Sequence, residues 1–293
     1  MKLGRFNNLG GETRLIAGPP LDVISVHPNA AWGARKLSSS YTGAACYAYN
    51  SDGSATDVYF DHNNEVSLKS PTNWTGSANL RDFSALTSDG NVFVGTWYDQ
   101  TTGTNTLNAT QTTSSERPLL LEAGEMRKKG LRFIDDYFKV ENYRFPNPND
   151  SCTILAVAAT KGGTYGVITD IEAYDDGVEL IYAASEWSWR IKNSDLEDNP
   201  VGVGADLQLA IAMYDTSLGS RQQTLRVNGV GTSKNCSEDK HVASTDRFRI
   251  GARKTTDNQL NGWIGEGMIW DSAIPESDLL YLENNIFLHY SIP

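Results

Sequence analysis

The sequence predicts an all-β sandwich with an extended N-terminal arm and a short C-terminal helix. Short apolar segments follow one another from residue 118 onward, separated by turn residues and without alternating helices. This spacing is typical of a β-sandwich. The segment 262–270 is apolar on both faces, which indicates a strand that is covered on both sides. The 293 residues, 39% of them hydrophobic, suffice for one large β domain or two small ones.

The N-terminal arm comprises residues 1–26, and the sandwich domain comprises residues 27–293. The arm contains a turn-forming segment at 7–11 and a stiff Gly-Pro-Pro segment at 18–20. A disordered terminus is one interpretation. We favour a docking peptide that is ordered by a partner or by the main domain, because the arm is more apolar than a free tail needs to be. Its apolar residues are Leu15, Ile16, Leu21, Val23 and Ile24.

The first part of the domain mixes helical and extended segments. Residues 28–37 are expected to form a short helix, and residues 79–83 a weaker one. Residues 44–49 and 56–60 form a hairpin around an Asp-Gly turn. Residues 92–100 are a strand that leads into an exposed loop at 101–117.

Strands dominate the remainder of the domain. We expect them at 131–133, 137–140, 152–159, 165–170, 178–183, 187–191, 207–214, 223–227, 247–250 and 262–270. In the last of these, alternation places Ile264, Met268 and Trp270 on one face and Trp263 and Ile269 on the other. Gly265 and Gly267 leave their face without side chains, so another segment should pack closely against that backbone.

The C-terminal helix has a clear start and one apolar face. Pro275 is suited to a helix start, and Glu276 and Asp278 suit the positive first turn. Apolar residues then recur at helical spacing, at Leu279, Leu282, Ile286 and Tyr290.

Charge and cysteine content exclude several classes of protein. The formal net charge of -11 argues against nucleic-acid binding, which needs a basic surface. Cys46, Cys152 and Cys236 are too few for a disulfide framework and are badly spaced for zinc. The sequence starts without a hydrophobic leader, and no apolar segment reaches transmembrane length. We therefore expect a soluble protein that is made in the cytoplasm.

Three segments carry a resemblance to a known family. They are residues 30–43 (AAWGARKLSSSYTG), residues 57–61 (DVYFD) and, most specifically, residues 96–100 (TWYDQ). They resemble the catalytic-domain family of fungal-type α-L-arabinofuranosidase B. The strand and helix at 262–290 look like the concanavalin A-like, laminin-G-like jelly roll to which that family belongs. The resemblance spans nearly the whole of residues 26–293 and implies a jelly-roll β-sandwich.

The resemblance implies a pair of carboxyl groups, because retaining furanoside hydrolysis needs a nucleophile and an acid about 5 Å apart. The positions that match the family's nucleophile strand are Asp170 and Glu172. In the loop that should hold the acid, this sequence has Arg253 and Lys254, and only Asp257 remains. The vicinal cysteine pair of those enzymes is absent. We therefore predict a non-enzymatic member, with Asp170, Glu172 and Asp257 as catalytic candidates for the alternative.

Aromatic residues in polar contexts are the candidates for carbohydrate binding, because sugars stack their C–H faces on aromatic rings. Trp187 and Trp189 alternate in a strand, so both indoles face either the core or a ligand. We add Trp74 and Asp99 to this set. Asp99 also has a structural interpretation as a loop anchor, and Glu266 is expected to satisfy backbone or arginine partners inside its strand.

We expect no cofactor, with Ca²⁺ as the alternative. The four histidines lack metal spacing. Acidic pairs at Asp135-Asp136 and Asp175-Asp176 and the run 195–198 supply oxygen ligands but match no defined calcium loop.

The sequence favours a phage virion structural or surface protein, such as a decoration, fibre or tail adhesin, that binds host carbohydrate. A jelly roll meant for the cell exterior needs a secretion signal, whereas a phage particle assembles inside the cell and leaves by lysis. The expected partners are other virion proteins, held through the arm, and a host surface polysaccharide. The alternative is a glycoside hydrolase of the α-L-arabinofuranosidase type.

Overall fold

The computed structural model describes most of the chain after residue 17. The described residues are 18–72, 81–82, 90–101, 106–126, 130–141, 143, 150–161, 166–171, 178–183, 186–191, 194–198, 206–217, 221–236, 248–253 and 259–292. No helix in these ranges is long and apolar enough to span a membrane.

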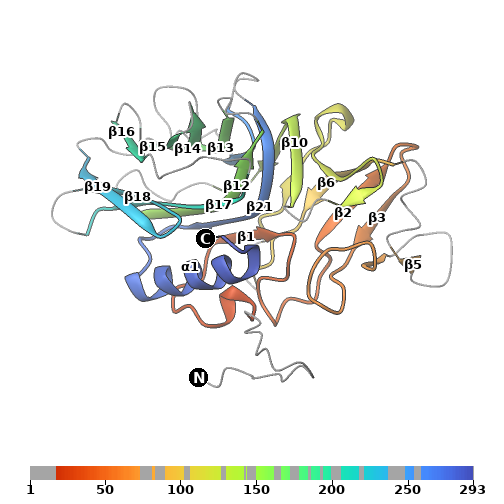
Figure 1. Ribbon diagram of the computed structural model, residues 1–293, viewed down its shortest axis with the longest axis horizontal. Coiled ribbons are helices and arrows are strands. Elements are labelled where there is room, and N and C mark those ends of the chain that lie inside the picture. The colour runs from red at the N-terminus through yellow and green to blue at the C-terminus, as the bar shows by residue number, and fades with distance from the viewer. Residues whose placement is uncertain are drawn as a thin grey trace.

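The described elements are mostly strands (Figure 1). The first strands are β1 (Ala30–Gly33), β2 (Cys46–Asn50), β3 (Ala55–Val58), β4 (Pro71–Thr72), β5 (Arg81–Asp82), β6 (Val92–Trp97), β7 (Ala109–Thr110), β8 (Leu119–Glu122), β9 (Glu125–Met126), β10 (Leu131–Asp136) and β11 (Phe138–Val140). The later strands are β12 (Cys152–Thr160), β13 (Gly166–Ile171), β14 (Val178–Ala183), β15 (Glu186–Ile191), β16 (Ser194–Asp198), β17 (Gln208–Asp215), β18 (Gln222–Val227), β19 (Val230–Asn235), β20 (Phe248–Ile250) and β21 (Leu260–Trp270). The helical elements are η1 (Pro20–Asp22), η3 (Ser114–Glu116) and α1 (Glu276–Tyr290).

The fold has three layers: two layers of sheet and a helix. Antiparallel pairing joins β21, β12, β17, β18 and β19 in one layer. In the other layer, β20 pairs with β13, β13 with β14, β14 with β15 and β15 with β16. A large apolar cluster lies between the sheet layers and includes residues of both, such as Ile154 and Leu180. Helix α1 lies below β17 and β21 in Figure 1, and a second cluster fills the space between them.

The predicted central strand is β21, and both of its faces are buried. Its register against β12 contains a bulge, because Val157 opposes Glu266 while Ala158 opposes Ile264. The extra residue, Gly265, reverses the alternation. Ile264 therefore shares the inter-sheet cluster with Ile269, and Trp263 packs on the helix side with Met268 and Trp270. The predicted grouping of Ile264 with Met268 was wrong for this reason.

The bulge also marks a change of neighbour along β21. Beyond it, Gly33 of β1 opposes Glu266, and before it Leu131 of β10 opposes Ile264. Gly130 lies against this point: a Cβ there would approach the Gly265 Cα to 2.5 Å, and its φ is +107°. The close packing expected at Gly265 is therefore confirmed, and only glycine fits at position 130.

The helix predicted at 28–37 is wrong. Residues 30–33 form β1, which pairs with β21 from Ala30↔Ile269 to Gly33↔Glu266. Trp32 faces the inter-sheet cluster, while Ala31 faces the helix-side cluster. Pairing with a strand more than 230 residues away overrides local preference here. In the weaker helix predicted at 79–83, the described residues 81–82 form strand β5.

The C-terminal helix is confirmed as α1, and Leu279, Leu282 and Ile286 are its buried residues on the sheet. Asp278 accepts hydrogen bonds from the backbone N–H of Ser25 and Val26, at 2.8 and 3.0 Å. Leu21 and Ile24 are buried in the same cluster. The described part of the arm, residues 18–26, therefore packs on its own domain. Residues 1–17 lie outside the described ranges.

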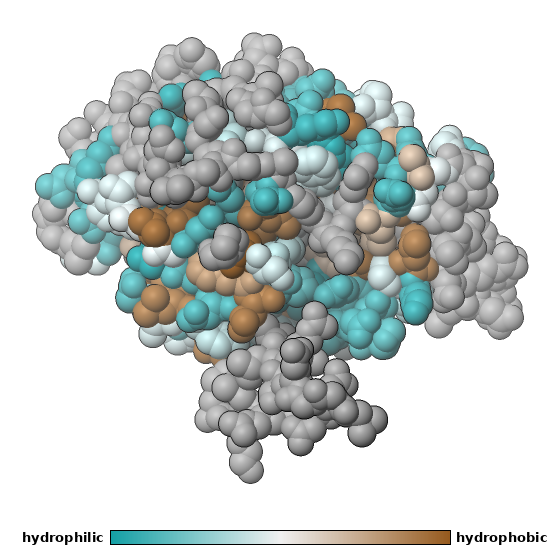
Figure 2. Space-filling view, viewed as in Figure 1, coloured by the Kyte–Doolittle hydropathy of each residue, from teal (hydrophilic) through white to brown (hydrophobic). Residues whose placement is uncertain are grey.

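The surface over α1 is partly apolar. On the face drawn in Figure 2, apolar residues gather over and beside the helix. Leu280 and Leu288, both on α1, are 47% and 56% exposed.

Candidate functional site

Asp99 of the Trp-Tyr-Asp-Gln motif is a loop anchor. It is 1% exposed, and its Oδ1 accepts hydrogen bonds from the backbone N–H of Ala31 and Thr101, both at 3.0 Å. Its Oδ2 accepts from the Thr101 hydroxyl at 2.8 Å and from the Leu107 N–H at 3.0 Å. Three of these contacts order the loop after β6, and the fourth, from Ala31, fastens the loop to β1. The carboxylate is thus not available to a sugar, and its assignment to carbohydrate binding was wrong.

Gln100 of the same motif positions Arg35. Its Nε2 donates to the carbonyls of Gly33 and Arg35 at 2.9 and 3.2 Å, and its Oε1 accepts from the Leu37 N–H at 2.8 Å. The side chain is fully buried. The motif therefore fixes the backbone that carries Arg35 out of β1.

Trp187 and Trp189 face the core. They are 1% and 0% exposed within the inter-sheet cluster, and the Trp187 Nε1 donates to the Gln208 Oε1 at 2.7 Å. Their alternation in β15 was predicted correctly, but the indoles point inward. No aromatic platform exists at these two residues, so this part of the sugar-site assignment was wrong. Trp74 lies outside the described residues.

The catalytic candidate Asp170 lies in a row of charged residues. The strand register places Arg249 opposite Asp170, Asp170 opposite Glu179, and Glu179 opposite Arg190. Residues that lie directly opposite in neighbouring strands point to the same side of the sheet. Asp170 and Glu179 are 1% and 2% exposed. The other two candidates, Glu172 and Asp257, lie outside the described residues.

Glu179 is held by two arginines. The Arg253 Nε and Nη2 lie 2.7 and 2.8 Å from its two carboxylate oxygens, and the Arg190 Nη1 lies 3.4 Å away. Arg253 thus makes one charge-assisted hydrogen bond to Glu179, from its Nη2, and its Nε adds a second close ionic contact. Arg253 thus comes from the loop in which the resemblance implied a catalytic acid, and it neutralises a neighbouring carboxylate there.

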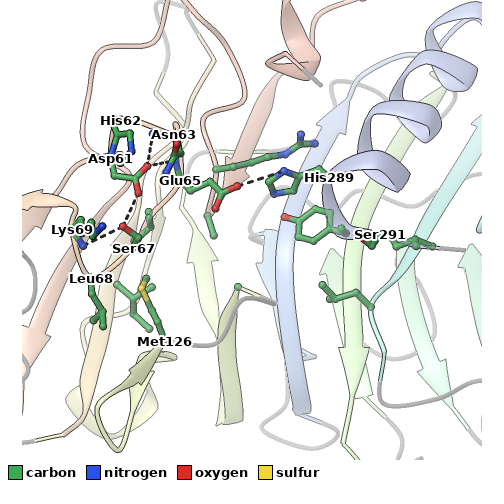
Figure 3. A pocket seen from close by; sticks show the side chains of 18 of the residues that line it. Asp61, His62, Asn63, Glu65, Ser67, Leu68, Lys69, Met126, His289 and Ser291 are labelled. Atoms are coloured by element: carbon green, nitrogen blue, oxygen red, sulfur yellow. Dashed lines mark hydrogen bonds and ion pairs between the residues drawn. The ribbon is translucent and has the colours of Figure 1, made fainter. Parts of the chain in front are cut away.

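A cleft of about 940 Å³ lies elsewhere, at the C-terminal end of α1. One wall is the segment Asp61–Lys69, and the other is formed by His289, Tyr290, Ser291 and Ile292 (Figure 3). Met126 and Leu207 add apolar surface. We call this the α1 cleft. Its volume lies in the range typical of small-molecule sites.

The floor of the α1 cleft contains a buried ion pair. The Arg35 Nε donates to the Glu266 Oε1, and the Nη2 lies 3.3 Å from the Oε2. Arg35 is 5% exposed and Glu266 is fully buried, so the expected arginine partner of Glu266 is confirmed. Burial, together with the Glu266 carboxylate, raises the pKa of Tyr290 well above its usual value.

Asp61 organises the wall formed by the 61–69 segment. Its carboxylate accepts hydrogen bonds from the N–H groups of Asn63 and Glu65, at 2.8 and 3.1 Å, and from the Ser67 hydroxyl at 2.7 Å (Figure 3). Burial alone would raise the pKa of Asp61, but these hydrogen bonds outweigh it and lower the pKa. Asp61 is therefore an ionised turn anchor near neutral pH.

Glu65 and His289 approach each other across the cleft (Figure 3). The His289 Nδ1 lies 3.8 Å from the Glu65 Oε1. Burial and the nearby Arg35 lower the pKa of His289 to about 4, although Glu266 opposes this shift. The imidazole is therefore neutral at pH 7. Glu65 is 52% exposed and faces solvent across the cleft.

Sequence reasoning missed the α1 cleft because its walls come from distant segments. One signal was present: Arg35 and Asp61 both lie in the segments that carried the family resemblance. Among the residues with described positions, no group of three or more His, Cys, Asp or Glu side chains could hold a metal ion. Of the acidic candidates for calcium, Asp175-Asp176 lies outside those positions.

Comparison with known proteins shows the fold. No protein-family model and no curated protein matches the chain. An arabinofuranosidase complexed with arabinofuranosyl-α-1,2-xylobiose is similar in structure, with a TM-score of 0.62 and 12% identity, over 93% of this chain and 65% of that chain. A GH54 α-L-arabinofuranosidase soaked with a cyclic sulfate inhibitor has a TM-score of 0.59 and 12% identity, over 90% and 63%. This chain thus spans less than two thirds of those proteins, and it shares their jelly-roll sandwich.

Proposed function

We propose that this protein binds carbohydrate in the α1 cleft and does not hydrolyse it. The observation that carries the proposal is the lining of the cleft. Polar groups of Asn63, Glu65 and Ser67 alternate there with the apolar side chains of Leu68 and Met126. Sugars need both kinds of surface, because hydroxyl groups seek hydrogen bonds while ring C–H groups seek apolar contact.

The jelly-roll fold supports a carbohydrate ligand by analogy. The solved structures that share it include an arabinofuranosidase with a bound arabinofuranosyl xylobiose. In the α1 cleft, the exposed Glu65 carboxylate and the neutral His289 imidazole would accept hydrogen bonds from sugar hydroxyls. Leu68, which is 39% exposed, would contact the ring.

Ion pairing in and near the candidate sites supports binding over hydrolysis. A glycosidase needs one carboxyl group that is protonated near neutral pH, to act as the acid. In the α1 cleft, Asp61 has a lowered pKa and Glu266 is paired with Arg35. In the charged row, Glu179 is paired with Arg253. In these two places the carboxyl groups serve as a turn anchor and as ion-pair partners, which supports binding over acid catalysis there.

The second candidate function is hydrolysis by a glycoside hydrolase of the α-L-arabinofuranosidase type. It is favoured by the direct opposition of the buried Asp170 and Glu179 in neighbouring strands. Such neighbours have Cβ atoms about 5 Å apart, which is compatible with a retaining carboxyl pair. Glu172 and Asp257 complete the set of carboxyl candidates.

The proposed setting is the surface of a phage particle, where the protein would join other virion proteins through its N-terminal arm and hold a host polysaccharide. Mass spectrometry of purified particles tests it directly, since a virion protein must co-purify with the particle at a fixed stoichiometry.

The experiment for the binding function measures retention on immobilised arabinan, arabinoxylan and host polysaccharide, together with reducing-sugar release. We expect retention without release. The double variant Glu65→Gln, Leu68→Ala should weaken retention at least tenfold, because it removes one charge and one apolar contact. Glu276→Gln, at the other end of α1 and 64% exposed, is the matched charge control. Sustained release that Asp170→Asn abolishes would instead establish the hydrolase.

A further inference from the structure

A second hollow, of about 340 Å³, lies away from the α1 cleft, next to η3. It is lined by Phe93 of β6, Ser114 and Ser115 of η3, Arg117, and Ile134 and Asp136 of β10. We call it the Asp136 hollow. Its volume is at the low end of ligand sites, which suits one sugar ring.

Arg117 is held rigidly at this hollow. Its guanidinium lies 3.7 Å from the centre of the Tyr49 ring. The Nε and Nη2 donate to the carbonyls of Gln111 and Thr112 at 3.3 and 3.2 Å. Tyr49 in turn lies over Gly95, where a Cβ would come within 2.4 Å of the ring. The guanidinium has more donors than these two carbonyls use, so the remaining ones are pre-positioned for a ligand.

Asp136 lines the hollow and is held by the backbone of its own strand. The residue is 5% exposed, and its Oδ2 accepts from the Ile134 N–H at 2.8 Å. This hydrogen bond fixes the orientation of the carboxyl group at the hollow, where a ligand hydroxyl would bind to it.

The charges around Asp136 tune its protonation. Burial raises its pKa to about 7; the Ile134 N–H and Arg132 oppose this shift, while Asp135 and Glu116 add to it. Arg117 lines the same hollow. The carboxyl group therefore changes charge within the physiological range of pH.

Three apolar residues, Phe93, Leu119 and Ile134, complete the lining of the hollow. Phe93 is partly exposed, and Ile134 is 42% exposed although it lies in a strand. The hollow thus combines an apolar floor, one fixed cation and one acid. An anion would be repelled by Asp136, and a cation by Arg117, whereas a neutral polyol satisfies both.

We propose that the Asp136 hollow is a second carbohydrate subsite that takes a single sugar ring. The ring C–H face rests on Phe93 and Ile134, and the hydroxyl groups bind Asp136 and Arg117. The class of ligand rests on the proposed function, but the place is separate from the α1 cleft. Two subsites on one chain would raise the avidity for a polysaccharide without any new contact between them.

Saturation-transfer NMR with L-arabinose, D-xylose and D-galactose tests the subsite, with titration to obtain Kd. We expect at least one monosaccharide to bind, and Asp136→Asn to weaken it at least tenfold. The asparagine can still accept from the Ile134 N–H, so the fold is kept. Glu125→Gln is the charge control: it removes an exposed carboxylate that does not line the hollow and does not shift the pKa of Asp136. Binding to wild type should strengthen from pH 6 to pH 8, and Asp136→Asn should abolish this dependence.

The outcomes separate this subsite from the proposed function. Monosaccharide binding that survives Glu65→Gln, Leu68→Ala but not Asp136→Asn supports the subsite. Binding that the cleft variant abolishes and Asp136→Asn leaves intact overturns the subsite and keeps the proposed function. No binding of any of the three sugars to wild type also overturns the subsite. Reducing-sugar release that depends on Asp136 would overturn the assignment as a binding site.

Discussion

The buried pair Arg35–Glu266 gives the sharpest test of how the domain is held together. Arg35→Met removes the positive charge and keeps much of the side-chain volume. It leaves Glu266, which is fully buried, as an uncompensated carboxylate. Breaking a buried pair from one side costs about 3–5 kcal/mol. In a domain of this size, the loss corresponds to a fall in Tm of about 10 °C.

The double variant Arg35→Met, Glu266→Gln should recover most of this loss, because the remaining amide carries no charge that has to be compensated. With Glu266→Gln as the second single variant, urea unfolding at pH 7 measures the four free energies of unfolding and gives the coupling between the two residues. A single variant no less stable than the double variant at pH 7 would refute the reasoning.

Three further predictions concern other parts of the fold. Asp136→Asn should stabilise the protein by about 1–2 kcal/mol at pH 8 and by nothing near pH 4. Because the pKa of Asp136 is raised to about 7 in the folded protein, stability falls as the pH rises from about 4 to about 7, and the full cost, reduced here for solvent screening, remains above pH 7; thermal melts against pH would show this, and a pH-independent difference would contradict it. Trp189→Ala should cost about 3–5 kcal/mol while glycan retention per folded molecule stays unchanged, because the indole is core; calorimetry with the retention assay checks both. Asp278→Ala should expose the segment 18–26 to protease while the β-sheet circular dichroism persists, because three hydrogen bonds to Ser25 and Val26 are lost; an unchanged cleavage pattern would count against this anchor.

Local patterns predicted most strands and the final helix. The hairpin of β2 and β3, the buried strand β12 and the spacing of Leu279, Leu282 and Ile286 are all readable from short windows. Strand β1 could not be predicted in this way, because its four residues gain their strand character only by pairing with β21. The reversal of faces at Gly265 was hidden for a similar reason, since a bulge is defined by the partner strand.

The candidate site was harder to predict than the fold. The Trp-Tyr-Asp-Gln motif was found, but only the hydrogen bonds of Asp99 and Gln100 show that it fastens one loop to another. Alternation in β15 could not say which side of the sheet Trp187 and Trp189 occupy. The role of Arg253 depends on Glu179, which is 74 residues away in sequence. Such contacts follow from the tertiary fold and leave no mark in a short window of sequence.

The order in which a ribosome releases this chain gives β21 a particular role. β21 contacts β1, β10 and β12, whose residues are synthesised long before it. β1 has no other pairing partner among the described strands. It therefore cannot pair until more than two hundred further residues have been translated. Contacts between residues this distant in sequence slow folding. Until they form, apolar surface and unpaired strand edges stay exposed to solvent. During synthesis, β1, β10 and β12 therefore depend on chaperones or on rapid completion of the chain. A polypeptide that ends before residue 260 lacks β21 and cannot form the complete sheet.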